Sequence, residues 1–287
     1  MDDARVGALF ILLSGTGFGT LGVLGVVAGD AGLSIPTVLF FRFGLASVLV
    51  TAALAARGEL ELLRGRNLAA GVGLGAFGYA AMSGLYFVGL EYMTAGMVGI
   101  VLYTYPAFVL VLAAVFLEER VGRKSIAALL VTLGGVALIT GADPAAADPR
   151  GVGIVLVAAV VYATYITISR TALRDVSAPT LTAHVLPAAA LTFLVIGAAT
   201  NSLAMPQTAV GWGSVIGIAA LGTAVPIFAF FAGLSRIGAG PASILSAVEP
   251  VVTVALGAVF LAEPVSVVVI VGGLLVLVGV VLVPRRQ

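Results

Sequence analysis

One pattern of residues occurs twice in this chain, and the two copies lie 144 positions apart. The run GLEYMTAG at 89–96 has GLSRIGAG at 233–240 as its counterpart, since 233 − 89 = 144. The same offset pairs Gly7 with Gly151, Thr20 with Thr164, Gly78 with Gly222 and Gly135 with Gly279. The repeat predicts two halves of similar structure. Such duplication in a very apolar chain is typical of transporters whose halves rock about a central site.

The repeat divides the chain into a first half at 1–141, an outer linker at 142–150 and a second half at 151–287. The linker sequence ADPAAADPR combines prolines with small residues, which is typical of an exposed connector. The other loops are short, so we expect neighbouring helices to form hairpins, with no extramembrane domain. We expect the protein to be a monomer.

The composition requires a lipid environment. Hydrophobic residues make up 61% of the chain and charged residues 9%, too few to cover a water-soluble globule. A net charge of +1 without a basic run gives no indication of nucleic-acid binding. With no cysteine and a single histidine, we expect no disulfide, no metal site and no cofactor. The N-terminus lacks the positive segment of a cleaved signal peptide.

Ten apolar segments are long enough to cross a bilayer, whose core of ~30 Å needs about 20 residues of helix. They are 6–28, 35–56, 68–90, 94–117, 124–141, 151–170, 179–200, 212–234, 239–261 and 265–283. Backbone polar groups in lipid must be bonded internally, and the alternation of a β-barrel is missing. The sequence therefore predicts an all-α integral membrane protein with ten transmembrane helices.

The basic residues set the orientation of these helices. Twelve of the 14 lie in one set of loops and ends, which we expect to be cytoplasmic together with both termini. Only Arg150 lies on the opposite side, and Arg42 lies within a span. Because five helices per half is an odd number, the second half must cross the membrane upside down. The basic residues are almost all Arg, which suggests a GC-rich bacterial genome. The fold expected is two inverted five-helix repeats.

Glu249 is predicted to lie roughly 15 Å into its span, close to the middle of the bilayer. Pro250 follows it and removes a backbone donor, so the preceding turn is expected to bend around a cavity. Ser246, Glu249 and Thr253 are spaced to share one face of an unbroken helix. We interpret this face as wet, although a purely structural carboxyl at the kink is an equal alternative.

Arg42 and His184 are the other ionisable residues within the spans. For Arg42 we favour snorkelling or a structural bond to carbonyls, since its repeat counterpart at the same offset is Leu186. For His184 we favour the role of a hydrogen-bonded structural group over that of a proton carrier. If transport is coupled to protons, Glu249 and His184 are the candidate groups.

Aromatic residues gather at the same depth as Glu249. Tyr86, Tyr92 and Trp212 are expected at the outer interface. The deeper group, with Ser83 on the face of Tyr79, comprises Phe18, Tyr79, Tyr103, Tyr105, Tyr162 and Tyr165. Hydroxyl-bearing aromatics can stack on and hydrogen-bond a small amphipathic substrate. The bland alternative for any single tyrosine is a hydroxyl bonded to a neighbouring carbonyl.

These features resemble the drug/metabolite transporter superfamily, specifically its EamA-type members with ten helices. The resemblance covers nearly the whole chain. It is carried by FRFGLA at 41–46, TAG at 94–96, GAG at 238–240, Pro106, Glu249-Pro250, FLEE at 116–119, FLAE at 260–263, GGV at 134–136 and VGV at 278–280. It implies an inner-membrane exporter with a pocket between the halves, similar to YddG-type amino-acid exporters. Phe18 stands where a tryptophan is typical.

The leading hypothesis is the export of amino acids or similar zwitterions by alternating access. Glu249 would bind the ammonium group, and the hydroxyls of Tyr79, Tyr103 and Tyr105 the carboxylate. The alternative is a proton-coupled exporter of drugs or organic cations, although Ser14 and Ala158 replace the first-helix carboxylate of the four-helix relatives. A nucleotide-sugar exchanger would need more intramembrane cations. An enzyme would require catalytic residues that this chain lacks.

The predicted topology can be tested with reporter fusions. Green fluorescent protein joined to either terminus should be fluorescent in bacterial cells, and alkaline phosphatase at either terminus should be inactive, because both termini are expected in the cytoplasm. Alkaline phosphatase inserted in the linker at 142–150 is the matched control and should be active. Termini on different sides of the membrane would contradict the inverted repeat.

Overall fold

The computed structural model describes residues 3–89, 92, 98, 101–117, 121–139, 148–260 and 267–282. Most of the predicted linker, the TAG run at 94–96 and the glutamates at 118, 119 and 263 lie outside these residues. Every regular element in the described ranges is a helix. The prediction of an all-α architecture is confirmed.

Each of the ten predicted spans contains a described helix or a continuous series of helices. In chain order they are α1 (Asp3–Asp30), α2 (Ile35–Ala56), α3 (Gly65–Gly73) with η1 (Leu74–Tyr79) and α4 (Ala80–Gly89), α6 (Tyr105–Phe116), α7 (Arg123–Ile139), α8 (Pro149–Ala172), α9 (Ala178–Ala199), α10 (Ala209–Ala219) with η3 (Ala220–Ala224) and α11 (Val225–Ile237), α12 (Ala239–Leu245) with α13 (Val248–Phe260), and α14 (Val267–Leu282).

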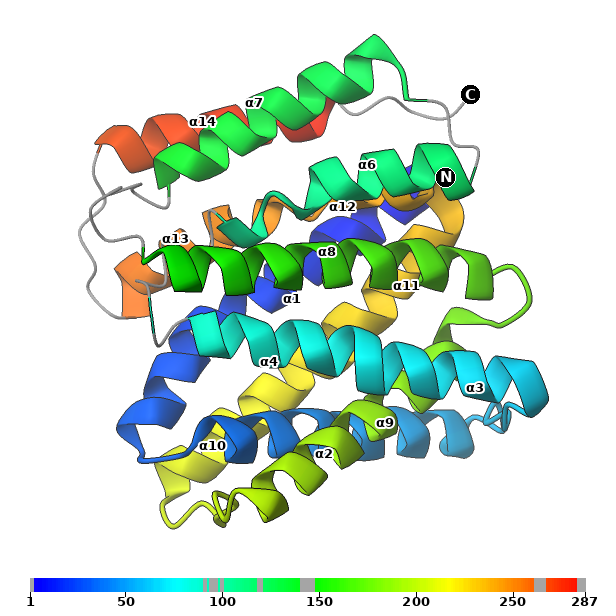
Figure 1. Cartoon of the computed structure of the whole chain (residues 1–287), viewed down its shortest axis with the longest axis vertical. Coiled ribbons are helices and arrows are strands. Elements are labelled where there is room, and N and C mark those ends of the chain that lie inside the picture. The colour runs from blue at the N-terminus through cyan, green and yellow to red at the C-terminus, as the bar shows by residue number, and fades with distance from the viewer. Residues whose placement is uncertain are drawn as a thin grey trace.

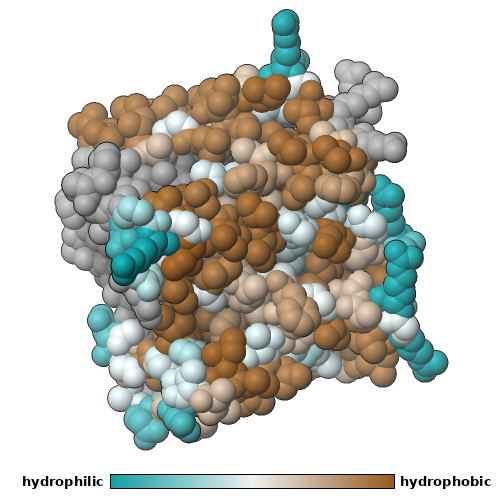
Figure 2. All heavy atoms as spheres, in the orientation of Figure 1, coloured by the Kyte–Doolittle hydropathy of each residue, from teal (hydrophilic) through white to brown (hydrophobic). Residues whose placement is uncertain are grey.

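Six of these segments are long and apolar enough to cross a membrane unaided, and shorter apolar helices accompany them. The helices lie roughly alongside one another, and α7 and α14 form a pair at one side of the bundle (Figure 1). Hydrophobic residues cover the middle of the face shown in Figure 2, and hydrophilic residues gather toward its left and right margins. This distribution matches a bilayer around the middle of the bundle.

Contacts between the two halves occur in equivalent pairs, in which each half contributes the glycine once and its partner once. A side chain at Gly78 would meet Tyr165, and one at Gly222 would meet Leu21. Since 222 − 78 and 165 − 21 are both 144, the two contacts are copies of each other. In the same way Gly89 lies against Val155, and Gly233 against Ile11. Figure 1 shows α1 and α8, the first helix of each half, running in opposite directions. The repeat is therefore inverted.

The offset of 144 does not hold along the second helix of each half. Ser34 caps α2 and accepts a hydrogen bond from the backbone of Thr37, whereas Ser177 caps α9 and accepts from Thr180. The equivalent caps are 143 residues apart (177 − 34). The prediction that pairs Arg42 with Leu186 is thus wrong by one residue, because the first half has one more residue before this cap.

The same two caps join α2 to α9 at both ends. The hydroxyls of Ser34 and Thr37 donate to the carbonyl of Ser202, in the loop after α9, at 2.7 and 3.0 Å. At the other end Thr180 donates to the carboxylate of Glu61, in the loop after α2, at 3.4 Å. Each helix therefore begins against the loop that ends its partner from the other half.

Two predicted spans each contain a π-helical turn. The backbone N–H of Ala80 donates to the carbonyl of Gly75, and that of Val225 to Ala220, each five residues back. These bonds define the π-helical turns η1 and η3, which overlap at an offset of 144. Such turns are rare and occur often at functional sites.

Glycines allow the closest approaches between helices. Gly15 and Gly19 of α1 face α13, where added side chains would lie 2.5 and 2.7 Å from Val248 and Val252. Gly75 faces the backbone of α9. Small residues at this spacing let membrane helices pack closely. Gly213 of α10 differs, since an added side-chain atom there would have no neighbour within 4 Å.

Gly75→Ala tests this packing. The new methyl group would lie 2.3 Å from the carbonyl oxygen of Val185, so α9 must move, and we expect a loss of about 1–3 kcal/mol of stability. Gly44→Ala is the control, because nothing lies within 4 Å of its added atom. Thermal unfolding of the detergent-solubilised variants measures the difference, and equal melting temperatures would contradict the close approach.

Candidate functional site

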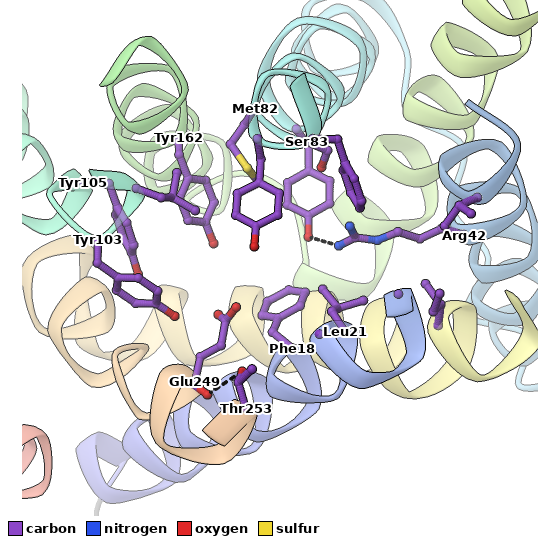
Figure 3. A pocket seen from close by; sticks show the side chains of 18 residues that line it. Phe18, Leu21, Arg42, Met82, Ser83, Tyr103, Tyr105, Tyr162, Glu249 and Thr253 are labelled. Atoms are coloured by element: carbon purple, nitrogen blue, oxygen red, sulfur yellow. Dashed lines mark hydrogen bonds between the residues drawn. The ribbon is translucent and has the colours of Figure 1, made fainter. Parts of the chain in front are cut away.

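A cavity of about 360 Å³ lies between the two halves. Its lining comes from seven of the ten spans: Phe18, Leu21, Gly22, Gly25, Val38, Arg42, Tyr79, Met82, Ser83, Tyr86, Phe87, Leu102, Tyr103, Tyr105, Tyr162, Ile218, Glu249 and Thr253. Most of these side chains are apolar or aromatic, with a few polar groups among them (Figure 3). This composition is typical of small-molecule sites, where the polar groups fix the orientation of the ligand.

Breaks in two helices place residues at this cavity. The helix of 239–260 is interrupted between Leu245 and Val248, because Pro250 has no N–H for the carbonyl of Ser246. Ser246 instead accepts from the backbone of Glu249 at 3.0 Å. In the first half Tyr103 and Thr104 form a turn before α6, and Pro106 follows Tyr105. Tyr105 and Glu249 are repeat equivalents (249 − 105 = 144), and both line the cavity.

The carboxylate of Glu249 points into the cavity, toward the hydroxyl of Tyr103 (Figure 3). Its backbone is held from the other side, because the hydroxyl of Thr253 donates to the carbonyl of Glu249 at 3.1 Å and to that of Gly19 at 3.3 Å. α13 is thereby fixed to α1 beside the carboxylate. The predicted bend before Pro250 is confirmed.

The tyrosines form one continuous wall. Ring centroids are 5.9 Å apart for Tyr103 and Tyr105, 4.7 Å for Tyr105 and Tyr162, 6.0 Å for Tyr162 and Tyr165, and 5.3 Å for Tyr165 and Tyr79. Aromatic rings at these separations stabilise one another beyond their burial. The wall is therefore a rigid surface that a ligand can contact.

Seven of the nine predicted substrate-binding residues line the cavity: Phe18, Tyr79, Ser83, Tyr103, Tyr105, Tyr162 and Glu249. Tyr165 does not, because its ring lies in the wall between Tyr79, Tyr162 and Phe231. Ser246 does not either, and its hydroxyl donates to the carbonyl of Ala242 at 2.9 Å. The predicted face of Ser246 assumed an unbroken helix. The substrate-binding roles themselves stay predictions.

His184 lies outside the cavity lining. Its Nε2 accepts the backbone N–H of Leu63 at 3.2 Å, so its Nδ1 carries the proton and donates to the carbonyl of Thr180 at 2.8 Å. Nε2 thus holds the loop after α2 against α9, whereas the bond of Nδ1 lies within α9. This geometry is the one expected for a hydrogen-bonded structural histidine.

Two cavity residues were assigned elsewhere from the sequence. Tyr86, expected at the outer interface, lines the cavity. Arg42, expected to snorkel or to bond carbonyls, is 5% exposed and points into the cavity, where it donates to Tyr79 and Thr223 (Figure 3). The position of a residue along a helix does not say which way its side chain turns.

Ser83 adds an unused polar group. Its side chain is 3% exposed, and its hydroxyl has no hydrogen-bond partner among the described residues. A buried hydroxyl without a partner costs free energy. Its position on the cavity wall makes a ligand atom the natural partner.

Comparison with known proteins gives consistent matches along the chain. The sequence profile of the EamA-like transporter family matches residues 5–141 and 149–284. An uncharacterized transporter of Archaeoglobus fulgidus is 28% identical over 221 residues, covering 75% of this chain and 76% of the relative. A probable terminal-alkyne amino-acid exporter of Streptantibioticus cattleyicolor is 29% identical over 267 residues, covering 90% and 85%.

A solved crystal structure has the same fold. It superposes with a TM-score of 0.83 at 20% sequence identity, and the match covers 99% of this chain and 98% of the other.

Cysteine labelling tests the cavity, since the chain has no cysteine of its own. Ser83→Cys should react with a small water-soluble methanethiosulfonate, because Ser83 lines the cavity. Ser246→Cys is the matched control and should stay unreacted in the folded protein, because Ser246 is buried against the Ala242 carbonyl. Mass spectrometry of the purified protein reads out both, and equal labelling rates would contradict the assignment.

Proposed function

Because the chain belongs to the EamA-like transporter family, we propose that it exports amino acids or similar small zwitterions by alternating access. The observation that carries the proposal is the pairing of one carboxylate, Glu249, with several hydroxyl groups on the wall of an otherwise apolar cavity. An ammonium group needs an anionic partner in such a place, and a carboxylate needs donors. The name of the relative from Streptantibioticus cattleyicolor points to the same substrate class.

The wall gives the substrate a defined orientation. The hydroxyl of Tyr105 donates to the carbonyl of Ser243 at 3.3 Å, whereas Ser83 has no partner among the described residues. Glu249 holds the ammonium group, and Tyr79, Tyr103 and Ser83 supply donors for polar atoms of the substrate. Phe18, Met82 and Leu102 offer an apolar surface for the rest of the substrate.

If export exchanges the substrate for a proton, Glu249 is the group that carries it. Glu249 lines the cavity, whereas both ring nitrogens of His184 are bonded away from it. The site works in a bacterial inner membrane, between halves at 1–141 and 151–287 of a single subunit, with both termini in the cytoplasm. It requires no cofactor.

An exporter of organic cations is the alternative, and the aromatic wall with a carboxylate favours it. The presence of Arg42 disfavours organic cations as substrates, because a buried guanidinium on the same cavity repels a second cation. Resistance of cells to cationic dyes measures this activity directly.

Glu249→Gln tests the leading proposal. Counterflow of the twenty standard L-amino acids in proteoliposomes identifies those that the wild type exchanges. For these, the variant should lose about ten- to a hundredfold in apparent affinity, because a charge-assisted hydrogen bond is replaced by a neutral one. Glu59→Gln is the control, since Glu59 is exposed in the loop after α2. Unchanged exchange of every amino acid by Glu249→Gln would contradict the role.

A further inference from the structure

We infer that Arg42 binds the carboxylate of the transported zwitterion and so determines which substrates the cavity accepts. This inference deepens the proposed function and rests on it. It replaces the sequence-based interpretation of Arg42 as a snorkelling residue.

The guanidinium is held from three directions. Its Nε donates to the hydroxyl of Thr223 at 2.9 Å, and its Nη2 donates to the hydroxyl of Tyr79 at 3.0 Å. Its Cζ lies 4.9 Å from the ring centroid of Phe43. A planar guanidinium fixed in this way keeps its donors aimed in constant directions, as recognition of a carboxylate requires.

The two hydroxyls that hold Arg42 come from different halves of the protein. Tyr79 and Thr223 are repeat equivalents (223 − 79 = 144), and they lie in the π-helical turns η1 and η3. Thr223 uses its own proton to donate to the carbonyl of Ile218 at 2.8 Å. Tyr79 accepts from Arg42, so its O–H remains to donate to a ligand. Arg42 therefore lies where the two halves meet.

The acidic residue that shares the cavity with Arg42 is Glu249, and its carboxylate is not in direct contact with the guanidinium. Within the described part of the chain Arg42 forms no ion pair, although its side chain is only 5% exposed. A buried charge without a counter-charge is strongly unfavourable. Two of its five N–H groups are used by Thr223 and Tyr79. Among the described residues no other group accepts from the guanidinium, which leaves three N–H groups for a ligand, and an anionic ligand would place a counter-charge directly against Arg42.

The two charged side chains that line the cavity enter it from different sides. In Figure 3 Arg42 reaches in from one side and Glu249 from another, with Phe18 and Leu21 between them. A zwitterion can therefore place its carboxylate at Arg42 and its ammonium group at Glu249. A ligand that has only one of these charges leaves the other protein charge unbalanced.

Three related compounds separate the two contacts: L-leucine, L-leucinamide, which lacks the carboxylate, and 4-methylpentanoate, which lacks the ammonium group. Isothermal titration calorimetry on the purified full chain in detergent gives their affinities. Arg42→Gln should weaken L-leucine and 4-methylpentanoate by about ten- to a hundredfold and should not weaken L-leucinamide, a cation that Arg42 repels. Glu249→Gln should weaken L-leucine and L-leucinamide and spare 4-methylpentanoate.

An equal loss for all three compounds in Arg42→Gln would overturn the inference, because it would mean that Arg42 only positions Tyr79 and Thr223. Arg42→Lys keeps the charge without the planar fork, and should show a smaller loss with the same selectivity. If neither variant folds, the affinities of the wild type for L-leucine and L-leucinamide still test the inference. L-leucinamide should bind about tenfold or more weaker than L-leucine, since one charged contact is lost. Equal binding would overturn the inference.

The outcomes also separate this inference from the proposed function. Arg42-dependent binding of 4-methylpentanoate by a protein that exchanges no amino acid would keep the carboxylate site and reject amino-acid export. Normal amino-acid exchange and binding in Arg42→Gln would reject the carboxylate site at Arg42 and keep amino-acid export.

Discussion

The absence of water inside a bilayer governs where this backbone can depart from the α-helix. Each free N–H or C=O group in lipid is costly, so irregular turns are tolerated only where they lie within protein or line a cavity. The described residues include two π-helical turns, and in two further spans a turn next to a proline. All four contribute residues that line the cavity or hold its arginine: Tyr79, Thr223, Tyr105 and Glu249. The irregular backbone and the site are thus one feature.

The two halves share their helix packing but differ in the side chains that line the cavity. The contacts of Gly78 with Tyr165 and of Gly222 with Leu21 are equivalent, yet one partner is aromatic and the other aliphatic. At the helix breaks the first half has Tyr105 where the second has Glu249. The first half alone has Arg42. An inverted pair of bundles therefore encloses an asymmetric site, with its cation from one half and its anion from the other.

Much of the fold followed from the sequence, because apolar length is a strong signal in a membrane protein. The distance of a residue from the start of its span also grouped most of the predicted site residues, and Tyr162 and Glu249 of that group line one cavity. The direction of a side chain could not be predicted where a helix is broken, which misplaced Ser246. Arg42 was missed although a signal existed, since an arginine within a span without an aqueous route needs buried partners. Nothing in the sequence marked the π-helical turns.

The reciprocal caps of α2 and α9 have a consequence for how the protein moves. Ser34 and Thr37 hold the loop beyond α9, while Thr180 and His184 hold the loop beyond α2. A motion that preserves these bonds carries the two helices as a single rigid body, although each belongs to a different repeat. The border between moving parts then cuts across the ancestral duplication instead of following it. Evolutionary units and mechanical units are, in this bundle, different sets of helices.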